Sequence, residues 1–477
     1  MSVRGIPFVA LLTLCSCAVG PDYHRPQLPV PSAWHAQKTV AATLATPDAW
    51  WQGFHDPLLN QLMLDALASN VDLRLALARI KDIRAQHAAT MAAGLPTLTA
   101  KSTLSRRFNN SSGASQPGGS NSSGGLGVGN QVINIFQLGF DAQWELDFFG
   151  GVRRAIEAAD ATLDAEVESS RDVTVTLLGE VARIYIELRS NQCLLRITHK
   201  NLDAQQDTQH LTVVRQQSGL ATQLEVAEAD AQVAATQAQL PDYERAVQQA
   251  MYALSVLVGR EPAALAARLE IPGEIPVLAS VAIPDLPSEL LKRRPDIRHA
   301  ERQMAIANAQ IGIATAELYP KVNLAAFLGL QNMNITDFTP IGKSWSAASS
   351  LSMPIFNWGK LNANIKSKEA QSEQSYLAYQ ATILNAFKEV EDALITRVKE
   401  QQRNKAIVQQ VAANRLAVEL AEELYQKGLT GFINVLQNQH ALYQAETNLA
   451  GSDAKLSTTQ VALYKALGGG WQVAGKP

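Results

Sequence analysis

The sequence predicts a mainly α-helical protein with a small β part, built from a duplicated unit of two strands and one long helical hairpin. Residues 151–240 and 359–476 contain no proline and are rich in Ala, Leu, Glu, Gln and Lys, which favours very long helices. Residues 138–148 alternate apolar and polar side chains, which is typical of a strand with one apolar and one polar face. Glycines recur at one constant interval in the two halves, which indicates an internal repeat.

The repeat is clearest at its turn glycines. Three of them recur 209 residues later, in the pairs Gly150 and Gly359, Gly219 and Gly428, and Gly259 and Gly468. Pro96 and Pro320 are 224 residues apart, so 15 extra residues (224 minus 209) fall in the first half, where the polar segment 109–130 reads as a long flexible loop. We expect the first repeat over residues 56–259 and the second over residues 288–468, with a proline-rich linker at 260–287 and a tail at 469–477.

Each repeat has the same predicted order of elements. Strands are expected near residues 97–107 and 132–148 in the first repeat, and near 321–331 and 344–356 in the second. Helical hairpins follow at residues 151–258 and 360–467. A continuous helix over residues 151–217 would be about 100 Å long at 1.5 Å per residue.

The N-terminus predicts export from the cytoplasm. Arg4 precedes a short apolar run, so residues 1–16 fit a signal peptide that is too short to span a bilayer. Leu14-Cys15-Ser16-Cys17 resembles a bacterial lipobox, and Cys17 is the expected acceptor of diacylglycerol and palmitate, the only cofactor that we expect; the alternative is an ordinary signal with incidental cysteines. Residues 17–55 would then run from the lipid anchor as an extended segment. The mature chain would keep only Cys193 as a free thiol, in an apolar helical stretch where a core position is expected.

Composition and motifs argue against several other classes of protein. The 41 Lys and Arg are interleaved with 44 Asp and Glu, which gives a net charge of -3 and argues against a nucleic-acid partner. The eight His are scattered, and neither a His-Glu-x-x-His motif, a Walker loop nor a nucleophile elbow occurs. We therefore expect no enzyme, no catalytic residue and no metal site.

The strands themselves raise the question of a membrane. About 9 to 11 tilted residues suffice for a strand to cross an outer membrane. Exposed strand edges are not tolerated in hydrocarbon, and the smallest closed barrels have about eight strands, so four strands would require oligomerisation. A dimer would supply eight strands and a trimer twelve, and the residues alone do not decide between them.

Several motifs spread over nearly the whole chain resemble the TolC-like outer membrane factors, in particular the NodT-type lipoprotein branch of resistance-nodulation-division efflux systems. They are residues 17–26 (CAVGPDYHRP), 50–51 (WW), 54–58 (FHDPL), 293–297 (RRPDI), 316–320 (AELYP) and 354–356 (PIF). The resemblance implies a homotrimer with one twelve-stranded transmembrane β-barrel, continued by a periplasmic α-helical barrel. It also implies a passive gated exit duct for small molecules such as drugs, located in the outer membrane and in contact with its lipid. Its partners would be a periplasmic adaptor, or membrane fusion protein, and an inner-membrane pump of the resistance-nodulation-division type.

The resemblance also assigns roles at the periplasmic tips of the hairpins. It implies adaptor docking at the two glycine turns, on Gly219, Leu220, Gly428 and Leu429, although all four also suit plain turn residues. It implies a latch between Tyr425 and Glu225, and a constriction at Asn434 and Gln437, where family members often carry acidic residues. Uncharged side chains there put strong cation selectivity in doubt.

The turns also predict how the returning helices begin. Thr222 and Glu225 have the spacing of a capping box. Thr430 is followed three residues later by Ile433, so the second turn offers the N-cap threonine of a capping box without its acidic partner.

Other functions remain open at this point. A periplasmic coiled-coil adaptor or scaffold lipoprotein would also have a lipobox and long helices, although the duplicated strands with Trp144 and Trp345 argue against it. Within the same fold, a duct for type I protein secretion or for metal-ion export is also possible. The 7 Met are not clustered, so nothing points to copper or silver.

Overall fold

The computed structural model describes residues 18–35, 48–109, 131–277, 287–332 and 343–474. The expected signal peptide, the proposed lipid acceptor Cys17 and nearly all of the polar insertion lie outside these residues. The chain divides into two compact units, of which unit 1 comprises residues 1–24, 83–163 and 303–375, and unit 2 comprises residues 25–82, 164–302 and 376–477. Both units take residues from both sequence repeats, so neither repeat forms a unit by itself.

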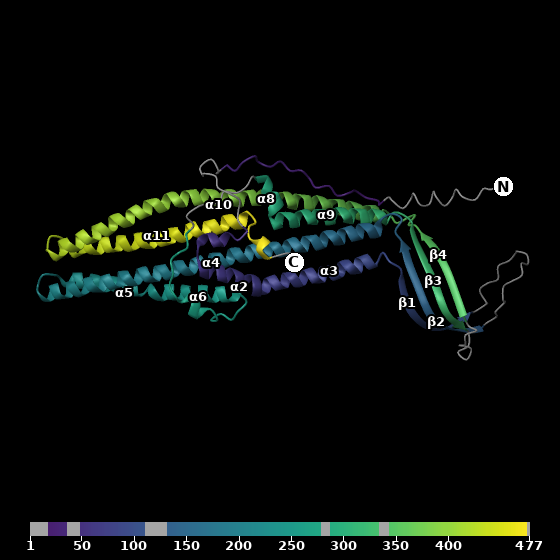
Figure 1. Cartoon of the computed structure of the whole chain (residues 1–477), viewed down its shortest axis with the longest axis horizontal. Coiled ribbons are helices and arrows are strands. Elements are labelled where there is room, and N and C mark those ends of the chain that lie inside the picture. The colour runs from purple at the N-terminus through teal and green to yellow at the C-terminus, as the bar shows by residue number, and fades with distance from the viewer. Residues whose placement is uncertain (1–17, 36–47, 110–130, 278–286, 333–342, 475–477) are drawn as a thin grey trace, which may run out of the picture. The chain divides into compact units, whose positions relative to one another are not determined.

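Unit 1 contains a four-stranded antiparallel sheet (Figure 1). Its strands lie in chain order, as β1 (Thr97–Asn109), β2 (Gln131–Leu146), β3 (Lys321–Asn332) and β4 (Lys343–Ser352). Each repeat therefore contributes one hairpin-like pair, and β2 of the first repeat pairs with β3 of the second. Strands β1 and β4 form the two edges, and one side of each has no partner strand among the described residues.

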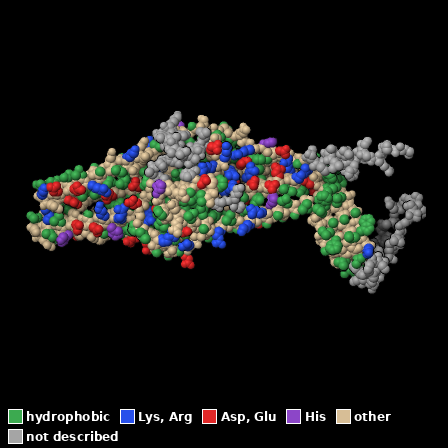
Figure 2. Space-filling model, in the orientation of Figure 1, with side chains coloured by type: hydrophobic (Ala, Val, Ile, Leu, Met, Phe, Trp, Pro, Cys, Tyr) green, Lys and Arg blue, Asp and Glu red, His purple; other side chains and the backbone are tan. Residues whose placement is uncertain are grey.

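One face of this sheet is apolar and open. In the register, Phe140 of β2 lies opposite Leu328 of β3, which lies opposite Trp345 of β4, and Trp144 lies opposite Leu324. These five side chains are between 36% and 77% exposed. Figure 2 shows hydrophobic side chains gathered over the sheet with few charged ones among them. A soluble protein rarely leaves a contiguous apolar patch of this kind uncovered.

The opposite face carries mainly polar side chains, above all Ser, Thr and Gln, and one aromatic side chain, Phe327. Gly139 and Gly329 are directly paired across β2 and β3. The buried ring of Phe327 lies over both, because a Cβ on either glycine would come within 2.7 Å of a ring atom. The glycine pair thus leaves room for the ring to lie flat, and the ring covers backbone that two glycines would leave bare.

The rest of the described chain is mainly helical. The elements are η3 (Trp50–Phe54), α2 (Pro57–Ser69), α3 (Val71–Ala92), α4 (Gly151–Gln217), α5 (Gln223–Gln237), α6 (Leu240–Leu257), α7 (Ala266–Leu269), α8 (Pro287–Arg293), α9 (Pro295–Ala316), α10 (Lys360–Gln426), α11 (Phe432–Ala466) and η7 (Trp471–Ala474). Among the described residues, none of these helices combines the length and the apolar character that crossing a membrane requires.

The two repeats differ where their hairpins return. Helix α11 continues past Ala450, whereas the first repeat breaks between α5 and α6, just before Pro241. Pro241 and Ala450 are related by the same 209-residue interval as the turn glycines. Proline has no backbone N–H and its ring clashes with the preceding turn, so it is tolerated at the start of α6 but ends the helix before it.

The main hydrophobic core lies in unit 2. Trp50, Trp51 and Phe54 of η3 are buried with Leu59 and Leu62 of α2. The core also includes apolar side chains between residues 177 and 188 of α4 and between residues 247 and 254 of α6. The Trp50 ring stacks on Tyr464 of α11 at 5.1 Å between centroids. The two tryptophans thus serve packing.

Cys193 of α4 departs from the expected core position, because it is only partly buried and its sulfur accepts a hydrogen bond from Arg196 at 3.4 Å.

Candidate functional site

The two long hairpins of unit 2 reverse at the same end, where α4 leads to α5 and α10 leads to α11 (Figure 1). Gly219 and Gly428 have left-handed φ angles of 75° and 71°. At the first turn the Leu220 N–H donates to the Arg215 carbonyl at 2.8 Å, and the Leu429 N–H donates to the Leu424 carbonyl at 2.9 Å at the second. Both turns are Schellman motifs, which need a residue that adopts the left-handed conformation at low cost.

The residues after each glycine are apolar and exposed. Leu220 is 68% exposed and Leu429 is 71% exposed. Leu224 at the start of α5 and Ile433 at the start of α11 are also exposed. Each tip therefore presents an apolar end to its surroundings. A Cβ added to Gly219 or Gly428 would meet no neighbouring segment within 4 Å, so the two glycines are set by their backbone conformation and not by close packing.

The returning helices begin in different ways. Thr222 is the N-cap of α5, and its hydroxyl accepts the Glu225 N–H at 3.3 Å, as the capping-box spacing predicts. At the second turn the prediction for Thr430 is wrong. The N-cap of α11 is Gly431, which makes no side-chain cap, and the Thr430 hydroxyl accepts from the Asn434 amide at 2.7 Å instead. A glycine at the N-cap moves the helix start one residue onwards.

The predicted latch residues do meet. Tyr425, on the last turn of α10, is 3% exposed, and its hydroxyl donates to Glu225 Oε2 at 3.4 Å. A hydroxyl-to-carboxylate bond is ordinarily about 2.5–2.7 Å long, so this contact is weak. The Tyr425 ring packs on Phe432 with centroids 5.7 Å apart. Packing therefore holds the tyrosine more firmly than its hydroxyl does.

Arg215 is a tip residue that the sequence did not single out. Its Nη1 donates to the Tyr425 carbonyl oxygen at 3.1 Å, and its guanidinium carbon lies 4.6 Å from the centroid of the Tyr425 ring. It is a basic residue in the last turn of α4, a common pattern at helix ends. That pattern does not reveal the contact with another helix.

The proposed constriction residues lie on the first turns of α11. Asn434 and Gln437 are both exposed in the single chain, and neither carries a charge. The Asn434 amide also donates to Thr430, which precedes α11, and this bond holds the Asn434 side chain against the start of its helix.

The segment that follows Cys17 belongs to unit 1 and is docked on the helices of that unit. The buried Arg154 donates to the carbonyls of Val19 at 3.2 Å and of Gly20 at 3.3 Å, and to the Asp22 carboxylate at 2.8 Å. Gly20 presses against Gly312, because a Cβ on Gly20 would lie 2.5 Å from the Gly312 Cα. Arg154 therefore ties this segment, named here the anchor segment (residues 18–24), to the helices at the base of the sheet.

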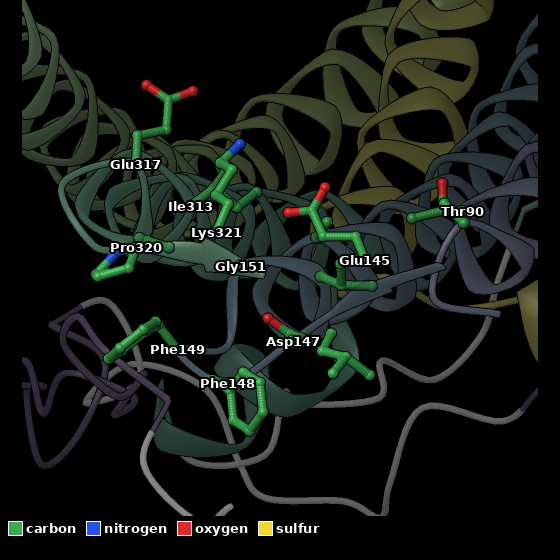
Figure 3. Close-up of a pocket in the computed structure, with 15 residues that line it drawn as sticks. Thr90, Glu145, Asp147, Phe148, Phe149, Gly151, Ile313, Glu317, Pro320 and Lys321 are labelled. Atoms are coloured by element: carbon green, nitrogen blue, oxygen red, sulfur yellow. The ribbon is translucent and has the colours of Figure 1, made fainter. Parts of the chain in front are cut away.

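A pocket of about 210 Å³ opens beside that base, where β2 passes into α4 and α9 passes into β3. Figure 3 shows the rings of Phe148 and Phe149 on one side of it and the carboxylates of Glu145 and Glu317 on the other. Phe149 also stacks on Tyr319, with ring centroids 4.8 Å apart. The base of the sheet is thus a zone where aromatic and charged groups meet.

The motif at residues 293–297 has a structural role in unit 2. Arg294 is buried and donates to Asp296, to Glu389 at 2.7 Å and to the Ala466 carbonyl at 2.8 Å. Burial lowers the pKa of Arg294, but the bonds to the two carboxylates outweigh it and hold the pKa above its ordinary value. Nearby, burial and the charge of Asp296 raise the pKa of Asp172.

The chain is similar to known proteins over nearly its whole length. The model of the family described as outer membrane efflux protein matches residues 62–260 and 286–469. The chain is 33% identical to the probable efflux pump outer membrane protein TtgC of Pseudomonas putida over 470 residues, which cover 97% of this chain and 94% of TtgC. It is 35% identical to the pyoverdine export outer membrane protein OpmQ of the same species, over 98% of this chain and 97% of OpmQ.

Solved structures agree with these relatives. The outer-membrane channel OprN superposes with a TM-score of 0.88 at 32% identity, over 96% of this chain and 100% of OprN. The open state of the MtrE outer membrane channel of Neisseria gonorrhoeae gives a TM-score of 0.80 at 27% identity, over 95% of this chain and 99% of MtrE. The chain belongs to the outer membrane efflux protein family, as its sequence motifs predicted.

Proposed function

We propose that three copies of this chain form the outer-membrane exit duct of a tripartite efflux system. Family membership supplies the outer-membrane location and the role in efflux. The observation that carries the proposal is the sheet, with its exposed apolar face and its two unpaired edges. Backbone groups at an open edge find no partner in hydrocarbon, so β4 of one copy must pair with β1 of the next until the sheet closes. Three copies give twelve strands.

We further propose that the duct is held by a lipid on Cys17. The anchor segment begins at the next residue and is fixed to α4 by Arg154, which supports an attachment close to the base of the sheet. In cells, Cys17→Ala is expected to abolish both labelling by radioactive palmitate and globomycin-sensitive processing. Continued labelling of the variant would contradict the assignment of Cys17.

The hairpin tips are the proposed docking surface for the periplasmic adaptor, with the inner-membrane pump supplying the energy. Leu220 and Leu429 offer exposed apolar contacts there, and Gly219 and Gly428 set the turns. A photocrosslinking side chain at Leu220 or Leu429 is expected to capture the adaptor in cells, whereas one at Leu384, which is also exposed but lies on the middle of α10, is not. Equal capture from all three positions would argue against tip docking.

The gate is proposed to combine the Tyr425–Glu225 latch with a constriction at Asn434 and Gln437. Because those two side chains are uncharged, the closed duct should discriminate weakly between cations and anions. Relatives are described as antibiotic, toluene and cation efflux proteins, and small molecules such as drugs are the cargo proposed here. The purified protein in a planar bilayer is expected to give discrete channels of small conductance; a verified trimer without channels would contradict the duct.

A further inference from the structure

We infer that Arg215 is the residue that holds the second hairpin against the first at the tip, and that it contributes more to keeping the duct closed than the Tyr425–Glu225 pair does. The inference rests on the proposed duct function, which it deepens by assigning the gate a positioning residue. It concerns three side chains from α4, α5 and α10, all within unit 2.

The first argument is the number of contacts that one guanidinium makes. Arg215 lies on the last turn of α4 and contacts Tyr425 of α10 in two ways, through a hydrogen bond to the carbonyl oxygen and a cation–π contact with the ring. The ring is almost completely buried, so the cation–π contact is not shared with water and is stronger than at an exposed site. Arg215 therefore fixes the backbone of the last turn of α10 as well as its side chain.

The second argument is the electrostatics of the helix ends. Helices α4 and α10 end at Gln217 and Gln426, and the carbonyls of a last turn carry partial negative charge. Helix α10 has no basic residue in its own last turn. Lys427 follows directly, but its ammonium group pairs with Glu423. Arg215 thus places positive charge beside the last-turn carbonyls of both helices. The C-terminal end of α10 is stabilised by a cation that α4 supplies.

The third argument is the weakness of the alternative. The hydroxyl of Tyr425 is 3.4 Å from Glu225, a long hydrogen bond. Glu225 also lies in the first turn of α5, where a carboxylate is favoured by the helix dipole whether or not Tyr425 is present. A phenylalanine at position 425 would lose this bond but keep both the ring and the carbonyl that Arg215 holds.

Single-channel recording of the purified full-length protein separates the two contacts. The closed duct should show the small conductance, and an open duct a larger one. In Arg215→Ala the fraction of time spent at the larger conductance should rise roughly tenfold or more, which corresponds to a change of about 1.4 kcal/mol in the free energy between the two states. Tyr425→Phe should change it less than threefold. Arg215→Lys keeps the charge but loses the planar stacking group, so its effect should lie between them. The matched control is Arg196→Ala, an exposed arginine on the same helix, which should behave as wild type.

A second readout does not depend on conduction. The amides of Gly428 and Leu429 donate to carbonyls of the last turn of α10, and Arg215→Ala should raise their hydrogen exchange roughly tenfold while the helical content stays unchanged. Normal exchange and normal channels in Arg215→Ala would overturn the inference, as would a Tyr425→Phe channel that opens as widely as the Arg215→Ala channel. Faster exchange in a protein that forms no channels would keep the contact and refute the duct.

Discussion

Removing the Arg154 guanidinium should release the anchor segment from the helices of unit 1. Arg154→Ala deletes the two bonds to the carbonyls of Val19 and Gly20, and each bond from a charged donor is worth about 1.5–3 kcal/mol. Both bonds are long, and the two carbonyls can bind water once the guanidinium is gone. We therefore expect the two bonds together to contribute about 1.5–3 kcal/mol to the free energy of docking the segment. The ion pair with Asp22 adds little, because that carboxylate is 79% exposed.

The assay is hydrogen exchange of a peptide that contains the anchor segment. The Val19 amide donates to the Phe149 carbonyl at 3.0 Å and reports whether the segment is docked. The energy above corresponds to an exchange rate roughly 10- to 100-fold faster in Arg154→Ala. Arg183→Ala, which removes an arginine that pairs with Glu180 and Glu187 of α4, should leave the rate unchanged. An unaltered rate in a folded Arg154→Ala protein would refute the reasoning.

Two further predictions concern the interior of unit 2. The buried Tyr185 hydroxyl donates to Asp56 at 2.5 Å and accepts from Arg189 at 3.0 Å. Tyr185→Phe removes both bonds, which should lower the free energy of unfolding by about 2 kcal/mol and so lower the thermal unfolding temperature. An unchanged unfolding temperature would contradict this prediction. Asp172 has a raised pKa, so the folded state binds its proton more tightly than the unfolded state does, and stability should fall as pH rises from about 4 through the folded pKa. Asp172→Asn should weaken that fall in unfolding temperatures measured from pH 4 to pH 8, and a fall as steep as in the wild type would exclude this cause.

The predicted fold class is confirmed, and the residues that carried it have local causes. The glycine pairs mark positions where a helix must end in a left-handed residue, and Gly219, Gly259, Gly428 and Gly468 all have positive φ. Alternation over residues 138–148 predicted one apolar face, which β2 has between Gln131 and Leu146. Such signals are readable because a single residue type, or a period of two, determines the local backbone.

Other features depend on contacts between distant segments. Arg154 and Arg215 bind backbone carbonyls, and a carbonyl leaves no mark in the sequence that would identify its partner. The Phe327 ring fits against the polar face because Gly139 and Gly329 are in register beneath it, and that register is a contact between two strands. Pro241 was visible as the first proline after a long helical stretch, and it marks the break that separates α5 from α6. The roles of the tip residues in docking and gating remain predictions.

Disulfide cross-linking across the sheet edges tests the closure of three copies most directly. Thr103 on β1 and Ser346 on β4 lie on the polar face of the two edge strands, and neighbouring positions on β4 allow the register between copies to be scanned. In a Cys193→Ala background, pairs of cysteines at these edges should give dimers and trimers and nothing larger, and single cysteines on either edge should give no such ladder. Products larger than trimers, or no product from any pair in the outer-membrane fraction, would contradict the closed trimer.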